Sequence, residues 1–163
     1  SSTEIKEFAT AEGNFKLIMD CINKIRSIRA YLKIPSKTII TCYSQNNIVI
    51  LKYALIIEKL ARLNKIIFID QEINNNSLFK EVISSNIIIG LDIKAIIDVD
   101  SEKQRLNSEK SKLITELNAI SAKLSNNNFI NKAPKDIVES FKSQHKELSF
   151  KLNTLNDIIA KLS

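Results

Sequence analysis

Hydrophobic residues recur every seven positions through the last third of the chain. In residues 99–125 and 135–162 the intervening positions are mostly polar, so each segment predicts a long helix with one apolar stripe. The stripes hold Val99, Leu106, Leu113, Leu117, Ile120 and Leu124, and then Val138, Phe141, Leu148, Leu152, Leu155, Ile159 and Leu162. A short polar connector makes each helix the other's partner. We expect residues 99–163 to form an antiparallel α-helical coiled-coil hairpin.

If this hairpin reverses near Phe129–Ile130, Leu117 faces His145. A lone histidine on such a stripe is expected to be packed rather than catalytic. Lys103 and Lys110 fall on the stripe near the base, where their stems can lie along the apolar surface while the ammonium groups reach water. We expect the base to be looser than the rest of the hairpin.

The first 98 residues alternate between helical and strand patterns. Apolar positions at helical spacing predict a helix over 14–34, which Pro35 ends. The very apolar segment 48–63 predicts a second helix, largely covered. Segments rich in β-branched residues predict strands at 37–43, 65–70, 78–84 and 86–93, the last two joined by a tight turn at Ser85–Asn86.

Together these elements predict an α+β fold. It has an N-terminal helix, a small mixed β-sheet with one covering helix, and then the long hairpin. Residues 1–13 are polar and unpatterned, and we expect them to be a loose leader. The chain begins with Ser1 rather than Met, which we interpret as a piece of a longer protein.

Composition narrows the function only a little. The chain has 24 Lys+Arg against 18 Asp+Glu, a net charge of +6 that weakly favours an acidic partner. The sequence has no apolar run of membrane-spanning length, so we expect a cytoplasmic protein with no membrane partner. Cys21 and Cys42 lack paired spacing and are expected to be reduced core thiols. The sequence has no catalytic constellation and no metal-ligand cluster.

The hairpin presents two candidate binding features outside its stripe. Arg105, Lys112 and Lys123 project within about 20° of one another along the first helix. They form either a phosphate-binding surface or a merely solvated face. Phe150 points away from the stripe with Lys146 one turn earlier, a pair suited to stacking on a nucleobase and holding a phosphate. Alternatively, Phe150 packs against the small sheet domain.

Several runs of residues resemble one family. They are Ile25-Arg26-Ser27-Ile28-Arg29 with Ile34-Pro35-Ser36-Lys37, Leu60-Ala61-Arg62-Leu63, Ala95-Ile96-Ile97-Asp98 with Glu102 and Arg105-Leu106, and Lys123-Leu124-Ser125-Asn126 with Phe129, Lys132-Ala133-Pro134 and Val138. The last group is the most specific. All occur in the family's order across residues 14–163, so the chain is similar to the C-terminal region of valyl-tRNA synthetases.

The resemblance implies a division of the chain. Residues 14–34 would be the last helix of an anticodon-binding domain, 35–98 a small α+β linker domain, and 99–163 a coiled-coil arm. The arm would lie against the tRNA corner where the D and T loops meet. The expected RNA-binding residues are Arg105, Lys112, Lys123, Phe129, Lys132, Lys135, Lys146 and Phe150, with Arg26 and Arg29 approaching the anticodon stem.

The same resemblance limits what this segment is expected to do. The parent enzyme uses ATP and magnesium to join valine to its tRNA, but the catalytic motifs are absent here, so the segment is expected to be noncatalytic, cofactor-free and monomeric. Phe129 would contact an exposed base pair or pack the turn closed. The alternative function is a coiled-coil protein-interaction or structural bracing element without RNA contact.

Overall fold

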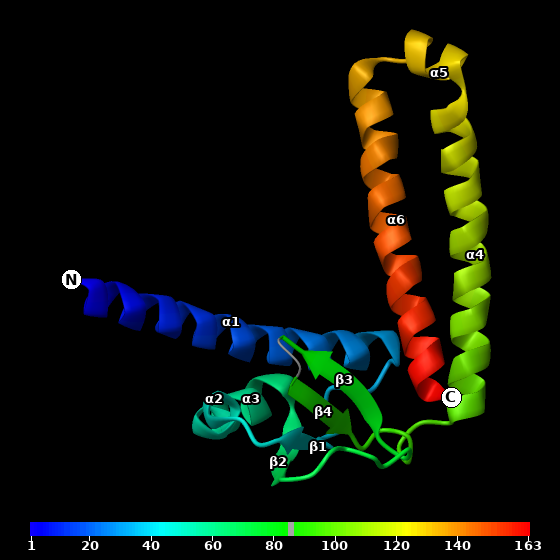
Figure 1. The fold of residues 1–163 in the computed structure, drawn as a ribbon. Coiled ribbons are helices and arrows are strands. Elements are labelled where there is room, and N and C mark those ends of the chain that lie inside the picture. Colours follow the sequence, from blue (N-terminus) through cyan, green and yellow to red (C-terminus); the bar gives the residue numbers. More distant parts are fainter. Residues whose placement is uncertain (85–86) are drawn as a thin grey trace. The chain divides into compact units, whose positions relative to one another are not determined.

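The computed structural model describes residues 1–84 and 87–163 and divides into two compact units, Ser1–Asp98 and Val99–Ser163. The first unit is a mixed sheet with helices (Figure 1), as the sequence predicts. Its elements are α1 (Ser2–Tyr31), β1 (Ile40–Gln45), α2 (Ile48–Lys52), α3 (Ala54–Ala61), β2 (Leu63–Ile69), β3 (Phe79–Ile83) and β4 (Ile87–Leu91).

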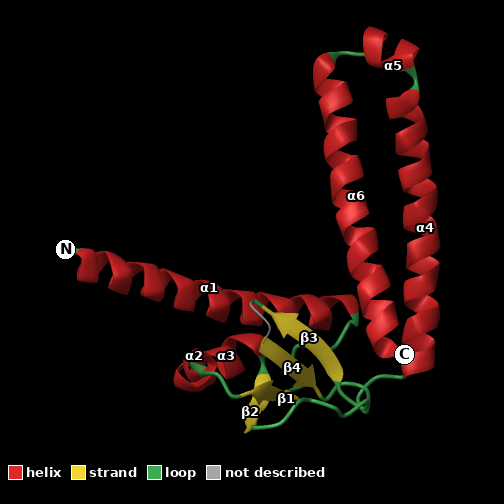
Figure 2. Ribbon diagram, viewed as in Figure 1, coloured by secondary structure: helices red, strands yellow, loops and turns green. Residues whose placement is uncertain are grey.

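The four strands form one sheet in the order β2-β1-β4-β3 (Figure 2). β1 and β2 run parallel with α2 and α3 between them, whereas β4 pairs antiparallel with both β1 and β3. The predicted strands are therefore confirmed in type and order, with ends displaced by up to three residues. The predicted turn at Ser85–Asn86 lies outside the described residues.

The expectation of a loose leader over residues 1–13 was wrong, because α1 is helical from Ser2. Ser1 caps the helix: its side chain accepts from the Glu4 N–H, and the Glu4 carboxylate reaches back to the Ser1 amino group at 2.6 Å. Such a reciprocal cap satisfies the first turn without any apolar stripe. The missing periodicity reflected exposure on all sides rather than the absence of a helix.

Two helices, not the expected single one, cover the sheet. The C-terminal half of α1 contacts both α3 and β3, and α3 contacts β2. Two polar links fasten α1 to the end of the sheet, an ion pair of Lys24 with buried Glu81 at 3.5 Å and a hydrogen bond from Ser84 to Asp20. The core between these layers includes Cys21, Ile22, Ile25, Ile40, Cys42, Ile57, Phe79 and Ile89.

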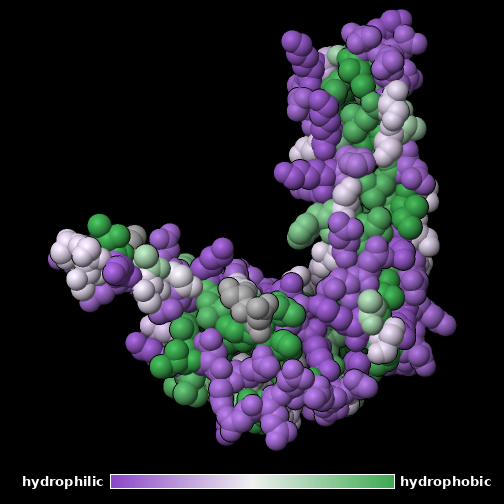
Figure 3. Space-filling model, viewed as in Figure 1, coloured by the Kyte–Doolittle hydropathy of each residue, from purple (hydrophilic) through white to green (hydrophobic). Residues whose placement is uncertain are grey.

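The apolar segment 48–63 also departs from expectation. It forms two helices that meet at Tyr53 and ends at Leu63, the first residue of β2; within the two helices only Ile50, Ile57 and Ala61 are buried. Five large side chains stay exposed, by 47% to 81%: Ile48, Leu51, Leu55, Ile56 and Leu60. Hydrophobic surface gathers over this region in Figure 3. A high apolar content predicts burial only if every face of the helix has a neighbour, and here one face has none within the described chain.

The second unit consists of α4 (Val99–Ser125), α5 (Asn127–Lys132) and α6 (Lys135–Leu162). α4 and α6 pack side by side and run in opposite directions (Figure 1). The predicted stripes supply most of their shared interior, in which the buried residues are Leu106, Leu113, Leu117, Ile120, Val138, Leu155 and Leu162. Ile158 was not predicted and is buried as well, whereas the predicted Phe141, Leu148, Leu152 and Ile159 are only half-buried. Lys103 and Lys110 are half-buried, and Leu106, which lies between them on α4, is fully buried. Side-chain packing therefore gives no support to a looser base.

The reversal of the chain comes later than expected. α5 occupies most of the predicted connector, capped by Asn126, whose side chain accepts from the Asn128 and Phe129 N–H groups. His145 is half-buried and its Nε2 lies 3.1 Å from the Ser121 hydroxyl. Ser121 stands one helical turn beyond Leu117, the partner predicted from a reversal at Phe129–Ile130. The helical connector explains the displacement.

Candidate nucleic-acid interface

The second unit carries most of its positive charge on its outer surface. Lys112 and Lys123 on α4, and Lys132, Lys135 and Lys146 around the reversal and along α6, are all exposed. Within residues 1–84 and 87–163, none of these five lysines forms an ion pair. Their ammonium groups are therefore available to an external anion.

Arg105 differs from these lysines although it shares their side of α4. Its guanidinium contacts the Glu102 carboxylate at 2.5 Å and the Glu109 carboxylate at 3.0 Å, and its side chain is only 24% exposed. The hydrogen bond from Arg105 to Glu102 is the main reason that its pKa is raised. Two carboxylates already neutralise this cation, so a phosphate would have to compete with them.

Two of the predicted binding residues, Lys123 and Phe129, meet the stripe residue Phe141 at the reversal. The Phe129 ring meets Phe141 edge to face at 5.6 Å between centroids, and Lys123 Nζ stands 4.6 Å from the centre of the Phe141 ring. Half-buried Phe129 therefore packs the turn closed, which was one of its two expected roles. Lys123 is held over an aromatic face and keeps its exposure, so its charge has a defined position at this end.

Phe150 is the most exposed aromatic side chain among the described residues of the second unit, at 73%. It lies outside the α4–α6 interface, and exposed Lys146 precedes it by one turn of α6. A large apolar ring left in water beside a cation costs free energy in the unbound protein. Phe150 and Lys146 therefore both present their side chains to solvent on the part of α6 outside the α4–α6 interface.

Arg26 and Arg29 have opposite environments. Arg29 is only 6% exposed and donates to three backbone carbonyls, those of Pro35 at 2.9 Å, Arg62 at 3.3 Å and Thr38. Burial, and then the neighbouring charge of Arg62, lowers its pKa. The expectation that Arg29 reaches RNA is therefore wrong, because its donors hold the ends of α1 and α3 together. Arg26, one turn earlier on α1, is exposed.

Sequence reasoning did not single out Lys59 and Arg62, which share a hollow with Arg26. In the sequence, Arg62 stood out only as part of Leu60-Ala61-Arg62-Leu63, one of the runs that carry the family resemblance. The structure brings it near α1 because Arg29 bonds its carbonyl. Residues 33 positions apart are connected here by backbone carbonyls, which leave no trace in side-chain patterns.

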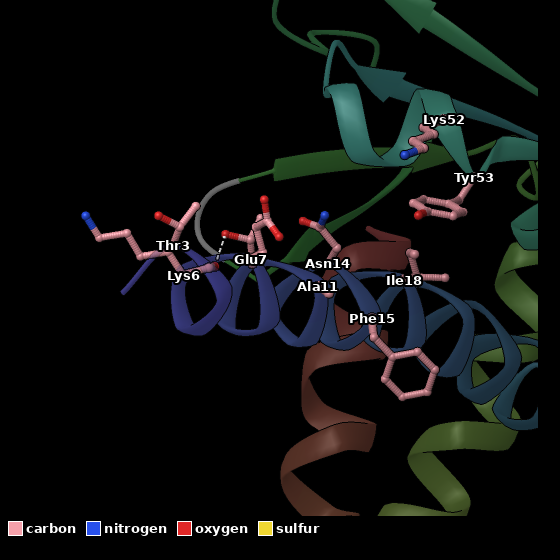
Figure 4. A pocket seen from close by; sticks show the side chains of 10 residues that line it. Thr3, Lys6, Glu7, Ala11, Asn14, Phe15, Ile18, Lys52 and Tyr53 are labelled. Atoms are coloured by element: carbon pink, nitrogen blue, oxygen red, sulfur yellow. Dashed lines mark hydrogen bonds between the residues drawn. The ribbon is translucent and has the colours of Figure 1, made fainter. Parts of the chain in front are cut away.

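Two further features of the described residues, a hollow of mixed charge and a pair of buried thiols, are less suited to binding an anion. A hollow of about 600 Å³ between α1 and the junction of α2 with α3 is lined by Lys6, Glu7, Phe15 and Tyr53 among others, with charges of both signs (Figure 4). Burial raises the pKa of Cys21 to about 11 and that of Cys42 further. Both thiols are free and buried, so they are poor nucleophiles. Among the described residues no helix is long and apolar enough to cross a membrane.

Comparison with known proteins decides the family. Residues 98–163 match the model of the valyl tRNA synthetase tRNA binding arm. The chain is also similar to three valine–tRNA ligases: 26% identical to that of Thermotoga maritima over 94% of its own length, 31% to that of Clostridium perfringens over 78%, and 28% to that of Petrotoga mobilis over 96%.

The chain belongs to the valine–tRNA ligase family. It spans 15% to 18% of the length of these three relatives, and its match includes the C-terminal arm of the family. The exposed lysines and Phe150 thus lie in the unit that is related to valine–tRNA ligase arms, and the hollow with Arg26 lies in the part that precedes the arm.

Proposed function

We propose that the chain is a tRNA-binding module of a valine–tRNA ligase, in which α4 and α6 contact the outer corner of tRNA where the D and T loops meet. The observation that carries this proposal is a row of unpaired exposed lysines, with Phe150 beside Lys146, on the unit related to tRNA-binding arms. The contact supports the joining of valine to its tRNA elsewhere in the enzyme.

Backbone phosphates account for most of the affinity in this mechanism. Lys112, Lys123 and Lys146 neutralise phosphates and release counterions, while Lys132 and Lys135 do so near the reversal. Phe150 stacks on an unstacked base of the corner, a mode that tolerates any base. Arg105 contributes least, because Glu102 and Glu109 already hold it. The module alone therefore binds several tRNAs with little preference.

We also propose that α4 and α6 form a coiled coil in the strict sense, with the side chains of each helix inserted between those of the other. The stripe repeats every seven residues over both helices, which is the repeat that supercoiling requires. Because this pairing buries most of the repeat of each helix within one chain, we propose that the arm is monomeric.

Catalysis belongs to the rest of the parent enzyme in this proposal. Valine, ATP and magnesium bind outside residues 1–163, in a cytoplasmic enzyme, and this chain holds no cofactor of its own. Its contribution is to position tRNA, as expected for a remote binding element whose free energy supports chemistry elsewhere.

A salt titration of tRNA binding tests the proposal. Replacing Lys112 and Lys146 with Ala removes two exposed, unpaired cations and should lower the salt slope by about two units. The matched control is Lys16→Ala with Lys65→Ala, which removes the same charge from exposed positions of the first unit. Equal slopes for the two double variants would refute the arm contact.

Sedimentation of the same samples addresses the rival function, a protein-interaction or bracing element. A chain that dimerises with rising concentration and is indifferent to tRNA would favour that rival. A monomer that sediments with tRNA, and loses it when Lys112 and Lys146 are replaced, supports the proposed module.

A further inference from the structure

A second cationic site lies in the first unit, where the C-terminal ends of α1 and α3 converge. A hollow of about 500 Å³ opens there, and its lining includes Arg26, Arg29, Lys59 and Arg62 but no acidic residue. Arg29 lies buried beneath, while the other three side chains are exposed at its rim. The hollow therefore combines one buried cation with three exposed ones.

The four charges have no acidic counterpart. Among the described residues none of the four forms an ion pair, and the guanidinium of Arg62 donates instead to the Ser36 carbonyl at 3.2 Å. The one acid near them on α3 is Glu58, whose Oε1 accepts from the Ile66 N–H at 2.9 Å. That bond holds the carboxylate against β2.

Helix dipoles explain only part of this arrangement. Each helix C-terminus carries roughly half a negative charge, so two of them balance about one cation. Four cations are present. In addition, Arg62 has φ 55° and ψ 52°, the left-handed conformation that favours Gly or Asn. An arginine in this costly conformation, with its carbonyl bonded by Arg29, points to a role for the side chain beyond ending the helix.

We infer that this hollow binds a backbone phosphate segment of RNA, through Arg26, Lys59 and Arg62. The inference rests on the proposed tRNA partner and adds a contact on the first unit. Guanidinium forks suit phosphate oxygens, and Arg29 fixes the ends of both helices so that the forks stay near one another. The hollow is larger than a single phosphate group, and exposed Leu60 on its wall offers an apolar surface to a ribose.

The test compares double variants of the full 163-residue chain in tRNA binding. The pocket variant is Arg26→Ala with Lys59→Ala, which leaves the helix-joining bonds of Arg29 intact. It is measured alone and combined with Lys112→Ala and Lys146→Ala. Lys16→Ala with Lys65→Ala is the charge-matched control, and Arg26→Lys with Lys59→Arg keeps both charges in place.

The pocket variant should lower the salt slope by about two units and weaken binding about tenfold or more near 0.1 M salt, in either arm background. The charge-keeping variant should bind as the unchanged chain does. A pocket variant that matches the control would overturn the inference. An arm variant that matches the control, while the pocket variant does not, would overturn only the proposed arm contact.

Two probes check the assignment to RNA. Inorganic phosphate should displace tRNA only at concentrations far above those at which tRNA binds, because a single phosphate makes one of several contacts. Polyglutamate, an acidic peptide, should compete weakly and equally with the unchanged chain and the pocket variant. Strong competition by either probe that depends on Arg26 and Lys59 would overturn the assignment to an RNA backbone.

Discussion

The two units of the chain hold positive charge in different ways. In the first unit, Arg29 is drawn inside and bound by three carbonyls at the converging ends of α1, the following loop and α3. In the second, the interior is a single apolar stripe with no converging backbone, so lysines such as Lys112 and Lys146 stay outside. A basic residue is thus structural where acceptors converge on it, as carbonyls do on Arg29 and carboxylates on Arg105, and stays available where its helical position leaves it in water.

The largest expected effect is a loss of stability confined to the second unit. Leu155 is fully buried between α4 and α6, and Leu155→Ala should lower the free energy of unfolding by about 3 kcal/mol. All three tyrosines (Tyr31, Tyr43 and Tyr53) lie in the first unit, so tyrosine fluorescence follows that unit while circular dichroism follows all helices. Only the dichroism transition should move. An equal shift in both signals would show that the units unfold as one.

The next effect concerns the first unit. Arg29→Ala leaves the carbonyls of Pro35, Thr38 and Arg62 without these bonds, and should cost about 2 kcal/mol of stability. Urea unfolding followed by tyrosine fluorescence measures it. The control is Arg26→Ala, an exposed neighbour one turn away whose loss should change stability by no more than about 0.5 kcal/mol. Similar costs for the two variants would refute the structural role of Arg29.

A smaller effect is expected in binding. Phe150→Ala should weaken tRNA binding by about 1–2 kcal/mol, roughly tenfold, because a stacked base loses its platform. Phe150→Tyr keeps the ring and should bind normally. Neither change should alter thermal unfolding, since Phe150 is 73% exposed. Equal affinity of the Ala and Tyr variants would exclude stacking at this position.

The smallest effect is a difference in thiol reactivity. Burial raises the pKa of both Cys21 and Cys42, so neither should react measurably with a disulfide reagent near neutral pH while the first unit is folded. The fully unfolded chain provides the control, in which both should react. The Leu155→Ala variant should be as unreactive as the original. Rapid reaction in that variant would mean that the arm stabilises the first unit.

The sequence predicted most of the interior of the second unit, although it missed buried Ile158 and included Phe141, Leu148, Leu152 and Ile159, which are only half-buried. A seven-residue repeat determines which side chains face inward whatever the rest of the chain does, so Leu106, Leu113 and Leu155 were identified correctly. It missed the helical connector, because α5 is only six residues long and caps itself at Asn126. Because of that short helix, His145 lies beside Ser121, one turn of α4 beyond the predicted partner Leu117.

Prediction was weaker in the first unit, because burial there depends on partners far apart in sequence. Segment 48–63 is apolar throughout, yet exposed Leu55 and buried Ile57 differ only in which neighbour they meet. The candidate site shows the same limit. The exposure of Lys146 and Phe150 could be predicted from helical projection. The burial of Arg29 could not, because it depends on the Arg62 carbonyl at the end of α3, far away in sequence.

A footprint of tRNA tests the central claim most directly. The unchanged chain should protect the D and T loops from cleavage, and Lys112→Ala with Lys146→Ala should remove that protection while Lys16→Ala with Lys65→Ala retains it. Protection of the D and T loops that survives the loss of Lys112 and Lys146, or its absence with the unchanged chain, would contradict the account.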